Sequence, residues 1–256
     1  MNIRDIKTKA KSVLVNRSNI IVVFIFISVV TTIINYISET LGVMIPFLSL
    51  LLSIIMLPFS HGNIVTALKA VNEQGDEISV EHEGLAGLKR FKELFFTYFL
   101  QTAFLMVIML LICLVLFLIA KLVIDESVFS NLGMLFSQAG IYTNDVTAYL
   151  QDPAFIQAAA SISGIVVLGL TVMVVVGVMY TLIFALTPYV LEKNKIYGVK
   201  AMSYSAHLMK GYKGTLFVLY LSYLGWYILT IVITAVVQAF LPIPLVIEIL
   251  MSALSV

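Results

Sequence analysis

The sequence predicts an all-α protein, a polytopic bundle of transmembrane helices with five full spans and a short sixth C-terminal helix. Of its 256 residues, 61% are hydrophobic and 11% are charged, whereas a soluble domain carries about a quarter charged residues. Each of five apolar runs reaches the roughly 20 residues that a helix needs to cross the hydrocarbon core. Helices satisfy their own backbone polar groups in lipid. The five runs cover residues 19–37, 43–68, 94–122, 155–190 and 215–241.

Proline positions refine these predicted helices. Pro58, inside the second run, predicts a kink or a break in that helix. Asp152 followed by Pro153 predicts the start of the fourth helix, with a capping side chain and proline at the first helical position. Residues 243–256 come directly after Pro242. They are long enough for either a short sixth span or a half-inserted helix.

Basic residues predict the orientation of the chain, which we treat as one membrane domain, 1–256. If the helices alternate in direction, every one of the fifteen lysines and arginines except Lys121 lies on the side of the N-terminus. Cytoplasmic segments carry this excess of positive charge. We therefore expect a plasma-membrane protein with a cytoplasmic N-terminus, a basic amphipathic segment at 1–18, a cytoplasmic loop at 69–93 and an extracellular loop at 123–154.

A second amphipathic helix is predicted at residues 198–211, lying in the cytoplasmic interface. Its basic flank has two interpretations. The favoured one is topology and anchoring, since basic residues border any cytoplasmic membrane surface. The other is binding of lipid headgroups by lysine ammonium groups and exposed glycine backbone. The residues that would form such a headgroup site are Lys200, Lys210, Gly211, Lys213 and Gly214.

Polar residues inside the apolar runs are candidates for a functional site. Side chains of this kind are costly in lipid, so they should face one another, a cavity or the interface. His61 lies near the Pro58 break, and transporters build sites at broken helices. The favoured interpretation is nevertheless structural, with His61 near the cytoplasmic end of a kinked helix. The intramembrane polar set is Asn35, His61, Asn63, Gln101, Gln238 and Glu248.

Small residues at helical spacing predict close helix packing rather than a ligand site. The residues concerned are Ala160 and Gly164 in the fourth run, and Ser222, Gly225 and Trp226 in the fifth. The acidic loop that includes Glu81, His82 and Glu83 lacks the spacing of a calcium loop, so we interpret it as solvated.

No catalytic constellation is apparent in the sequence. It contains no serine nucleophile elbow, no phosphate-cradling glycine loop and no zinc-ligand set. The single cysteine, Cys113, excludes an intrachain disulfide. We expect a protein that is not an enzyme and that needs no metal or cofactor. Nucleic acid is a poor partner, because the lysines adjoin the membrane and no recognition module surrounds them.

Three motifs carry a family resemblance: `FSHGNIVTALKAV` at 59–71, `GLAGLKRFKELFF` at 84–96 and `SAHLMKGYKGTLFVLYLSYLGW` at 205–226. They resemble the bacterial integral-membrane family "domain of unknown function 975", which is similar to the membrane domain of some glycerophosphodiester phosphodiesterases. The resemblance implies the fold and the membrane location, and no chemistry.

Two functions therefore remain as expectations. The favoured one is a non-catalytic factor in envelope maintenance or of the immunity type, acting by contacts with membrane lipids, another membrane protein or a second copy of itself. The alternative is a transporter or lipid-handling protein with a polar pathway between spans 2, 3 and 5.

Overall fold

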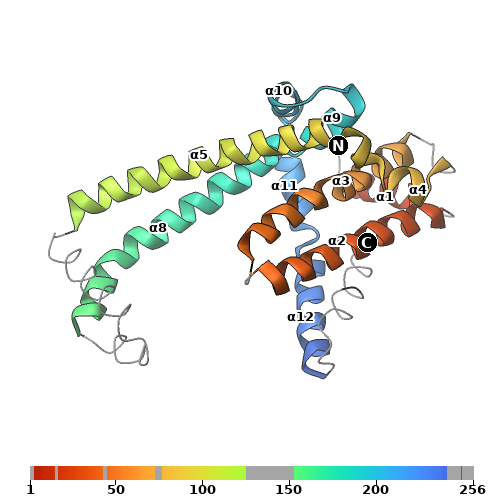
Figure 1. Ribbon diagram of the computed structural model, residues 1–256. Coiled ribbons are helices and arrows are strands. Elements are labelled where there is room, and N and C mark those ends of the chain that lie inside the picture. The colour runs from red at the N-terminus through yellow and green to blue at the C-terminus, as the bar shows by residue number, and fades with distance from the viewer. Residues whose placement is uncertain are drawn as a thin grey trace. The chain divides into compact units, whose positions relative to one another are not determined.

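The computed structural model describes residues 3–14, 17–42, 45–72, 77–124, 153–240 and 249. Every regular element in these ranges is a helix, which confirms the all-α prediction (Figure 1). The chain divides into two compact units. Unit 1 contains Met1–Gln101 and Leu182–Val256, and unit 2 contains Thr102–Thr181.

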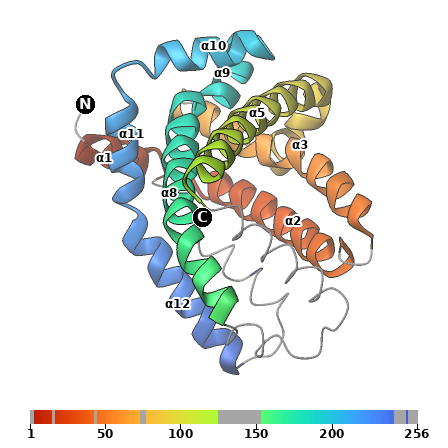
Figure 2. The same cartoon turned by 90° about the vertical axis from the view of Figure 1, so that its left-hand side faces the viewer.

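In unit 1, a hydrophobic core joins the first two spans. The amphipathic helix α1 (Ile3–Leu14) leads into α2 (Ser18–Gly42), and α3 (Pro46–Val71) packs beside α2 (Figure 2). The core is built from Ile20, Val23 and Ile27 of α2, together with Ala70 at the end of α3 and Ile78 in the following loop. The core side chains of α2 belong to its first turns, and Ala70 belongs to the last turn of α3. The core therefore holds the N-terminal end of α2 against the C-terminal end of α3.

Short helices follow in the predicted cytoplasmic loop. They are α4 (Val80–Glu83) and the 3₁₀ helix η2 (Ala86–Arg90), and η2 leads directly into α5 (Phe91–Val123). Both short helices pack against α3. A Cβ atom added at Gly87 would lie 2.1 Å from the Pro58 carbonyl oxygen, so only glycine allows η2 to approach α3 this closely.

The fourth predicted span is interrupted. Helix α8 (Pro153–Phe184) begins at Pro153, as predicted, and a turn separates it from α9 (Thr187–Asn194). Pro188 lies in the first turn of α9, where its missing N–H group costs nothing. The fourth segment therefore ends in a separate helix rather than in one overlong span.

Helix α10 (Val199–Leu208) confirms that residues 198–211 contain a helix. Its buried face packs on α9 and consists of Ala201, Met202, Ser205 and Met209. Val199, at the start of the helix, is 53% exposed. The apolar side of the amphipathic pattern is used for packing on α9.

The fifth predicted span consists of two helices, α11 (Lys213–Leu221) and α12 (Leu224–Phe240). They are separated by a turn at Ser222 and Tyr223, where Tyr223 N–H donates to the Tyr220 carbonyl at 3.0 Å. Ser222 Oγ donates to the Leu219 carbonyl at 2.5 Å, which satisfies one of the carbonyls at the end of α11.

Unit 2 contains most of α5 and α8. Gly169 of α8 faces Leu116 of α5, and an added Cβ atom would lie 2.7 Å from a Leu116 methyl group. Many large apolar side chains on both helices are exposed, among them Leu110 and Val174, at 65% and 64%. Such surfaces suit lipid better than water.

Five helical segments of the described chain are long and apolar enough to cross a membrane, as predicted. They are Ser18–Leu41, Phe47–Val71, Val80–Val123, Ile162–Asn194 and Lys213–Val236. Apart from residue 249, the predicted sixth C-terminal helix at 243–256 lies outside the described residues, as does most of the 123–154 loop. The protein is thus a multi-pass membrane protein with a helical fold.

Candidate functional site

Glu192 of α9 lies at the centre of an ion-pair cluster formed by three segments of unit 1. Its Oε2 atom is 3.2 Å from His61 Nε2 of α3 and 3.0 Å from Arg90 Nη1 of η2. Lys195 contacts the other carboxylate oxygen, and Arg90 also contacts Glu93. The His61 side chain is fully buried, while the side chains of Arg90 and Glu192 are 16% and 18% exposed.

The backbone around α9 reinforces this cluster. Arg90 Nη1 also donates to the Leu191 carbonyl at 2.9 Å, so one guanidinium group holds both a side chain and the main chain of α9. Lys195 ends α9 in the left-handed conformation, with φ of 55°. Arg90 and Lys195 place positive charge at the C-terminal end of the helix, where the helix dipole favours it.

A second ion pair, with a buried carboxylate, joins the end of α3 to α4. Lys69 Nζ is 2.6 Å from Glu83 Oε1, and the other Glu83 oxygen accepts the Ser79 N–H at 2.6 Å. Ser79 Oγ in turn accepts the His82 N–H at 3.3 Å, which caps α4. Glu83 is only 1% exposed. The interpretation of this loop as solvated is therefore wrong for Glu83, because Lys69 and the α4 cap compensate its buried charge.

Two side-chain hydroxyl groups form hydrogen bonds with the backbone of the turns next to α9 and α10. Thr97 Oγ1 of α5 accepts the Gly198 N–H at 2.8 Å, and both residues are buried. Gly198 has φ of 65° and ψ of −143°, a conformation open mainly to glycine. Ser205 Oγ accepts the Leu186 N–H and donates to the Ile183 carbonyl, each at 3.2 Å. The serine of the third family motif thus closes the turn between α8 and α9.

Of the predicted headgroup residues, Lys200 lies in the first turn of α10, Lys210 and Gly211 lie in the turn after it, and Lys213 and Gly214 begin α11. Lys200, Lys210, Gly211 and Gly214 are exposed and Lys213 is half-buried. Gly211 has φ of 88°, a conformation that suits glycine, in the turn between α10 and α11. Headgroup binding at these positions stays a prediction.

The predicted polar residues do not form one group in the described part of the chain. His61 belongs to the Glu192 cluster, Asn35 is exposed on α2, and Gln101 is half-buried on α5. Asn63 Oδ1 and His61 Nδ1 are buried without a hydrogen-bond partner among the described residues. The side chain of Gln238 and the whole of Glu248 lie outside the described residues.

The predicted packing residues face open space within the described chain. Added Cβ atoms at Gly164 and Gly225 would meet nothing within 4 Å. Ala160, Ser222 and Trp226 are exposed, Trp226 at 51%. Close packing through these positions stays a prediction, and it would need a surface beyond those described.

Sequence reasoning missed the carboxylates and cations that organise this site. The topology argument counted Arg90 and Lys69 only as cytoplasmic charges, Glu83 was interpreted as a residue of a solvated loop, and Glu192 was not singled out. A usable signal was available, since Arg90 and Lys69 lie within the family motifs and Glu192 directly follows an apolar run.

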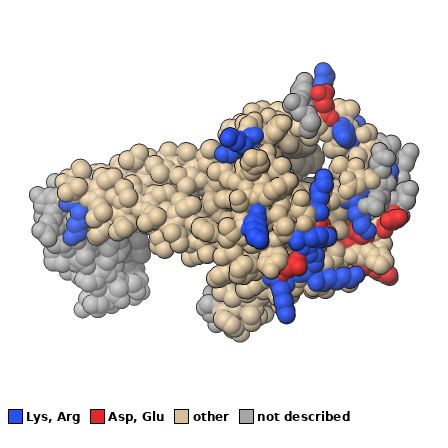
Figure 3. Space-filling view, turned by 90° about the horizontal axis from the view of Figure 1, so that it is seen from above, with Lys and Arg blue, Asp and Glu red and all other residues tan. Residues whose placement is uncertain are grey.

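Figure 3 shows that basic and acidic side chains lie intermixed over the same part of the visible surface.

Comparison with known proteins gives one result. A family model described as "Protein of unknown function (DUF975)" matches residues 1–249. No curated protein and no solved structure matches. The similarity to the membrane domain of glycerophosphodiester phosphodiesterases stays a prediction. With nearly the whole length matched by the family model, the chain belongs to the DUF975 family of proteins of unknown function.

Proposed function

We propose that this protein is a non-catalytic factor of the plasma membrane that supports the envelope, or protects it as an immunity-type factor, by contacting anionic lipids at the cytoplasmic ends of its helices. The proposal includes a cytoplasmic N-terminus, for which the distribution of lysine and arginine is the support. It assigns the protein no enzymatic activity and no cofactor.

One observation carries this proposal: three acidic side chains of unit 1 are engaged in ion pairs, whereas several of its lysines are exposed. Glu192, Glu83 and Glu93 each contact a basic partner. Helix α1 has no buried residue and carries more basic than acidic side chains. Each lysine near an anionic leaflet contributes about 1 kcal/mol of attraction, so such a surface favours acidic lipids. The exposed lysines include Lys9, Lys11, Lys200 and Lys210.

Aromatic side chains support the same placement. Tyr197, Tyr204 and Tyr212 flank and line α10 and are between 42% and 60% exposed. Tyrosine is enriched where a protein passes from the bilayer core to its headgroups. Helix α10 therefore offers lysines and tyrosines on its outer side, while its inner side packs on α9.

Deletion of the gene tests this function in cells. The deletion strain should become more sensitive to cationic membrane-active peptides and to envelope stress, and the wild-type gene should restore resistance. A gene carrying Lys200→Glu and Lys210→Glu should restore it less well, if protein levels are equal. Unchanged sensitivity of the deletion strain would count against an envelope role.

A transporter or lipid-handling protein is the second candidate. The unpartnered polar atoms of His61 and Asn63 on α3 support it, because such atoms are retained where a polar pathway needs them. The contact of His61 Nε2 with Glu192 supports the structural role instead. Purified protein in liposomes separates the two. Solute flux or lipid scrambling that disappears in His61→Ala, with the helical content unchanged, would favour transport.

A further inference from the structure

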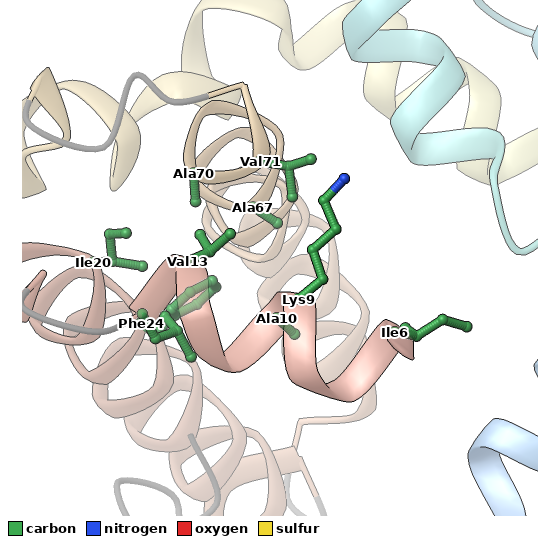
Figure 4. Close-up of a pocket in the computed structure, with 10 residues that line it drawn as sticks. Ile6, Lys9, Ala10, Val13, Ile20, Phe24, Ala67, Ala70 and Val71 are labelled. Atoms are coloured by element: carbon green, nitrogen blue, oxygen red, sulfur yellow. The ribbon is translucent and has the colours of Figure 1, made fainter. Parts of the chain in front are cut away.

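An apolar pocket lies between α1, the start of α2 and the end of α3, all in unit 1. It has a volume of about 400 Å³, and the side chains around it are almost entirely apolar (Figure 4). Small-molecule sites typically measure about 300–1,000 Å³ and combine an apolar lining with few polar groups. Its lining residues are Ile6, Lys9, Ala10, Val13, Leu14, Ile20, Phe24, Ala67, Ala70 and Val71.

The position of the pocket sets its depth in the bilayer. Ile20 and Phe24 belong to the first two turns of α2, and Ala67, Ala70 and Val71 belong to the last turns of α3. The pocket therefore lies where two spans reach the membrane surface on one side. Helix α1 passes over this end and contributes four apolar residues to the lining, of which Figure 4 shows Val13 close to α3.

Charge defines the kind of ligand that fits. Lys9 is the one charged residue among the ten that line the pocket, and Figure 4 shows its side chain extending alongside Val71. Neither Lys7 nor Lys11 of the same helix belongs to the lining, and the Lys7 ammonium lies over the Tyr223 ring, 4.3 Å from its centroid. An apolar cavity with an ammonium group at its rim matches a hydrocarbon chain that ends in an anionic headgroup.

We propose that this pocket binds one acyl chain of an anionic phospholipid, whose phosphate pairs with Lys9. The proposal rests on the proposed function, since it names the lipid class and the place where that lipid is held. Helix α1 would then be fixed to α2 and α3 by the lipid. This accounts for an amphipathic helix without a single buried side chain of its own.

Native mass spectrometry of the full chain in detergent, titrated with phosphatidylglycerol or phosphatidylcholine, tests this site. The wild-type protein should bind one phosphatidylglycerol in preference to phosphatidylcholine. Lys9→Glu should weaken phosphatidylglycerol binding by about fivefold or more, the factor expected for one interfacial lysine. Lys11→Glu is the matched control, because Lys11 lies on the same helix outside the pocket lining, and it should weaken binding less.

A bulky side chain introduced into the pocket tests lipid binding independently of charge. Ala67→Trp should reduce binding of both lipids, whereas Ala235→Trp, which adds the same side chain to an exposed position on α12, should not. Circular dichroism verifies that both variants fold. One outcome contradicts the pocket alone: all variants bind phosphatidylglycerol as tightly as the wild-type protein and still prefer it to phosphatidylcholine. The protein then binds anionic lipid at another place. If the wild-type protein shows no preference, both the pocket and its anionic ligand are contradicted, whereas the deletion phenotype tests the envelope role separately.

Discussion

His61 Nε2 lies 3.2 Å from Glu192 Oε2, although 131 residues separate the two in the sequence. Arg90 approaches the same oxygen at 3.0 Å, so a single carboxylate joins α3, η2 and α9. Removal of one partner from a largely buried charge cluster leaves the others without compensation. The Glu192 carboxylate is therefore expected to stabilise the packing of these three segments.

Glu192→Gln should lower the stability of the protein by about 1–3 kcal/mol, because the side chain keeps its shape but loses the charge that pairs with Arg90, which then has only Glu93 as an acidic partner. Thermal unfolding in detergent, followed by circular dichroism, measures the effect as a reduced Tm. Glu81→Gln is the control, since Glu81 is exposed on α4 and should change stability by less than about 0.5 kcal/mol. Equal Tm values for the two variants would contradict a stabilising cluster.

Gly87→Ala should be strongly destabilising, because its Cβ atom would lie 2.1 Å from the carbonyl oxygen of Pro58, which is main chain and cannot rotate away. Gly225→Ala provides the contrast. Gly225 lies in the first turn of α12 and its added Cβ atom would meet nothing within 4 Å, so this variant should keep the stability of the wild-type protein. Protein yield and Tm of the two variants, compared in the same detergent, give the result.

The Gly225 variant also tests the predicted helix packing. If Gly225→Ala is neutral for Tm in detergent but impairs function in cells, a surface outside the described residues packs against this glycine. Neutral behaviour in both assays would contradict a packing role for the serine-glycine-tryptophan pattern.

Thr97→Val should cost about 1–3 kcal/mol, because it removes the acceptor of the buried Gly198 N–H while keeping the side-chain volume. Thr171→Val is the matched control. Thr171 is exposed on α8, and its hydroxyl group donates a hydrogen bond to the Val167 carbonyl of the same helix. A Thr97 variant as stable as the Thr171 variant would show that the contact with Gly198 contributes nothing.

The sequence sufficed to predict the spans because their signal is local. An apolar run of roughly 20 residues contains all the information that a lipid-facing helix needs. The prediction placed one continuous helix at 155–190, but the structure breaks it before Pro188. The sequence alone does not distinguish a proline in the first turn of a separate helix from a proline that kinks a continuous helix. Packing decides between them, and here Ser205 closes the break.

The polar cluster could not be predicted because it depends on long-range pairing. Arg90 and Glu192 are 102 residues apart, and His61 and Glu192 are 131 apart. The sequence correctly identified His61 as an unusual residue, but it gave no means to select its partner. Counting lysines and arginines for topology treated Arg90 as a surface charge, although its side chain is only 16% exposed.

Orientation is the prediction with the widest consequences. Cysteines placed at Glu81 and at Ser137, in a Cys113→Ser background, should differ in their reaction with a membrane-impermeant maleimide on intact cells. The cysteine at position 81, in the 69–93 loop, should be protected, and the one at 137, in the 123–154 loop, should react. Both should react after permeabilisation. The reverse pattern would move α1, Lys9 and the apolar pocket to the outer surface, away from the anionic lipids of the cytoplasmic leaflet, and would remove the electrostatic basis of the proposed lipid site.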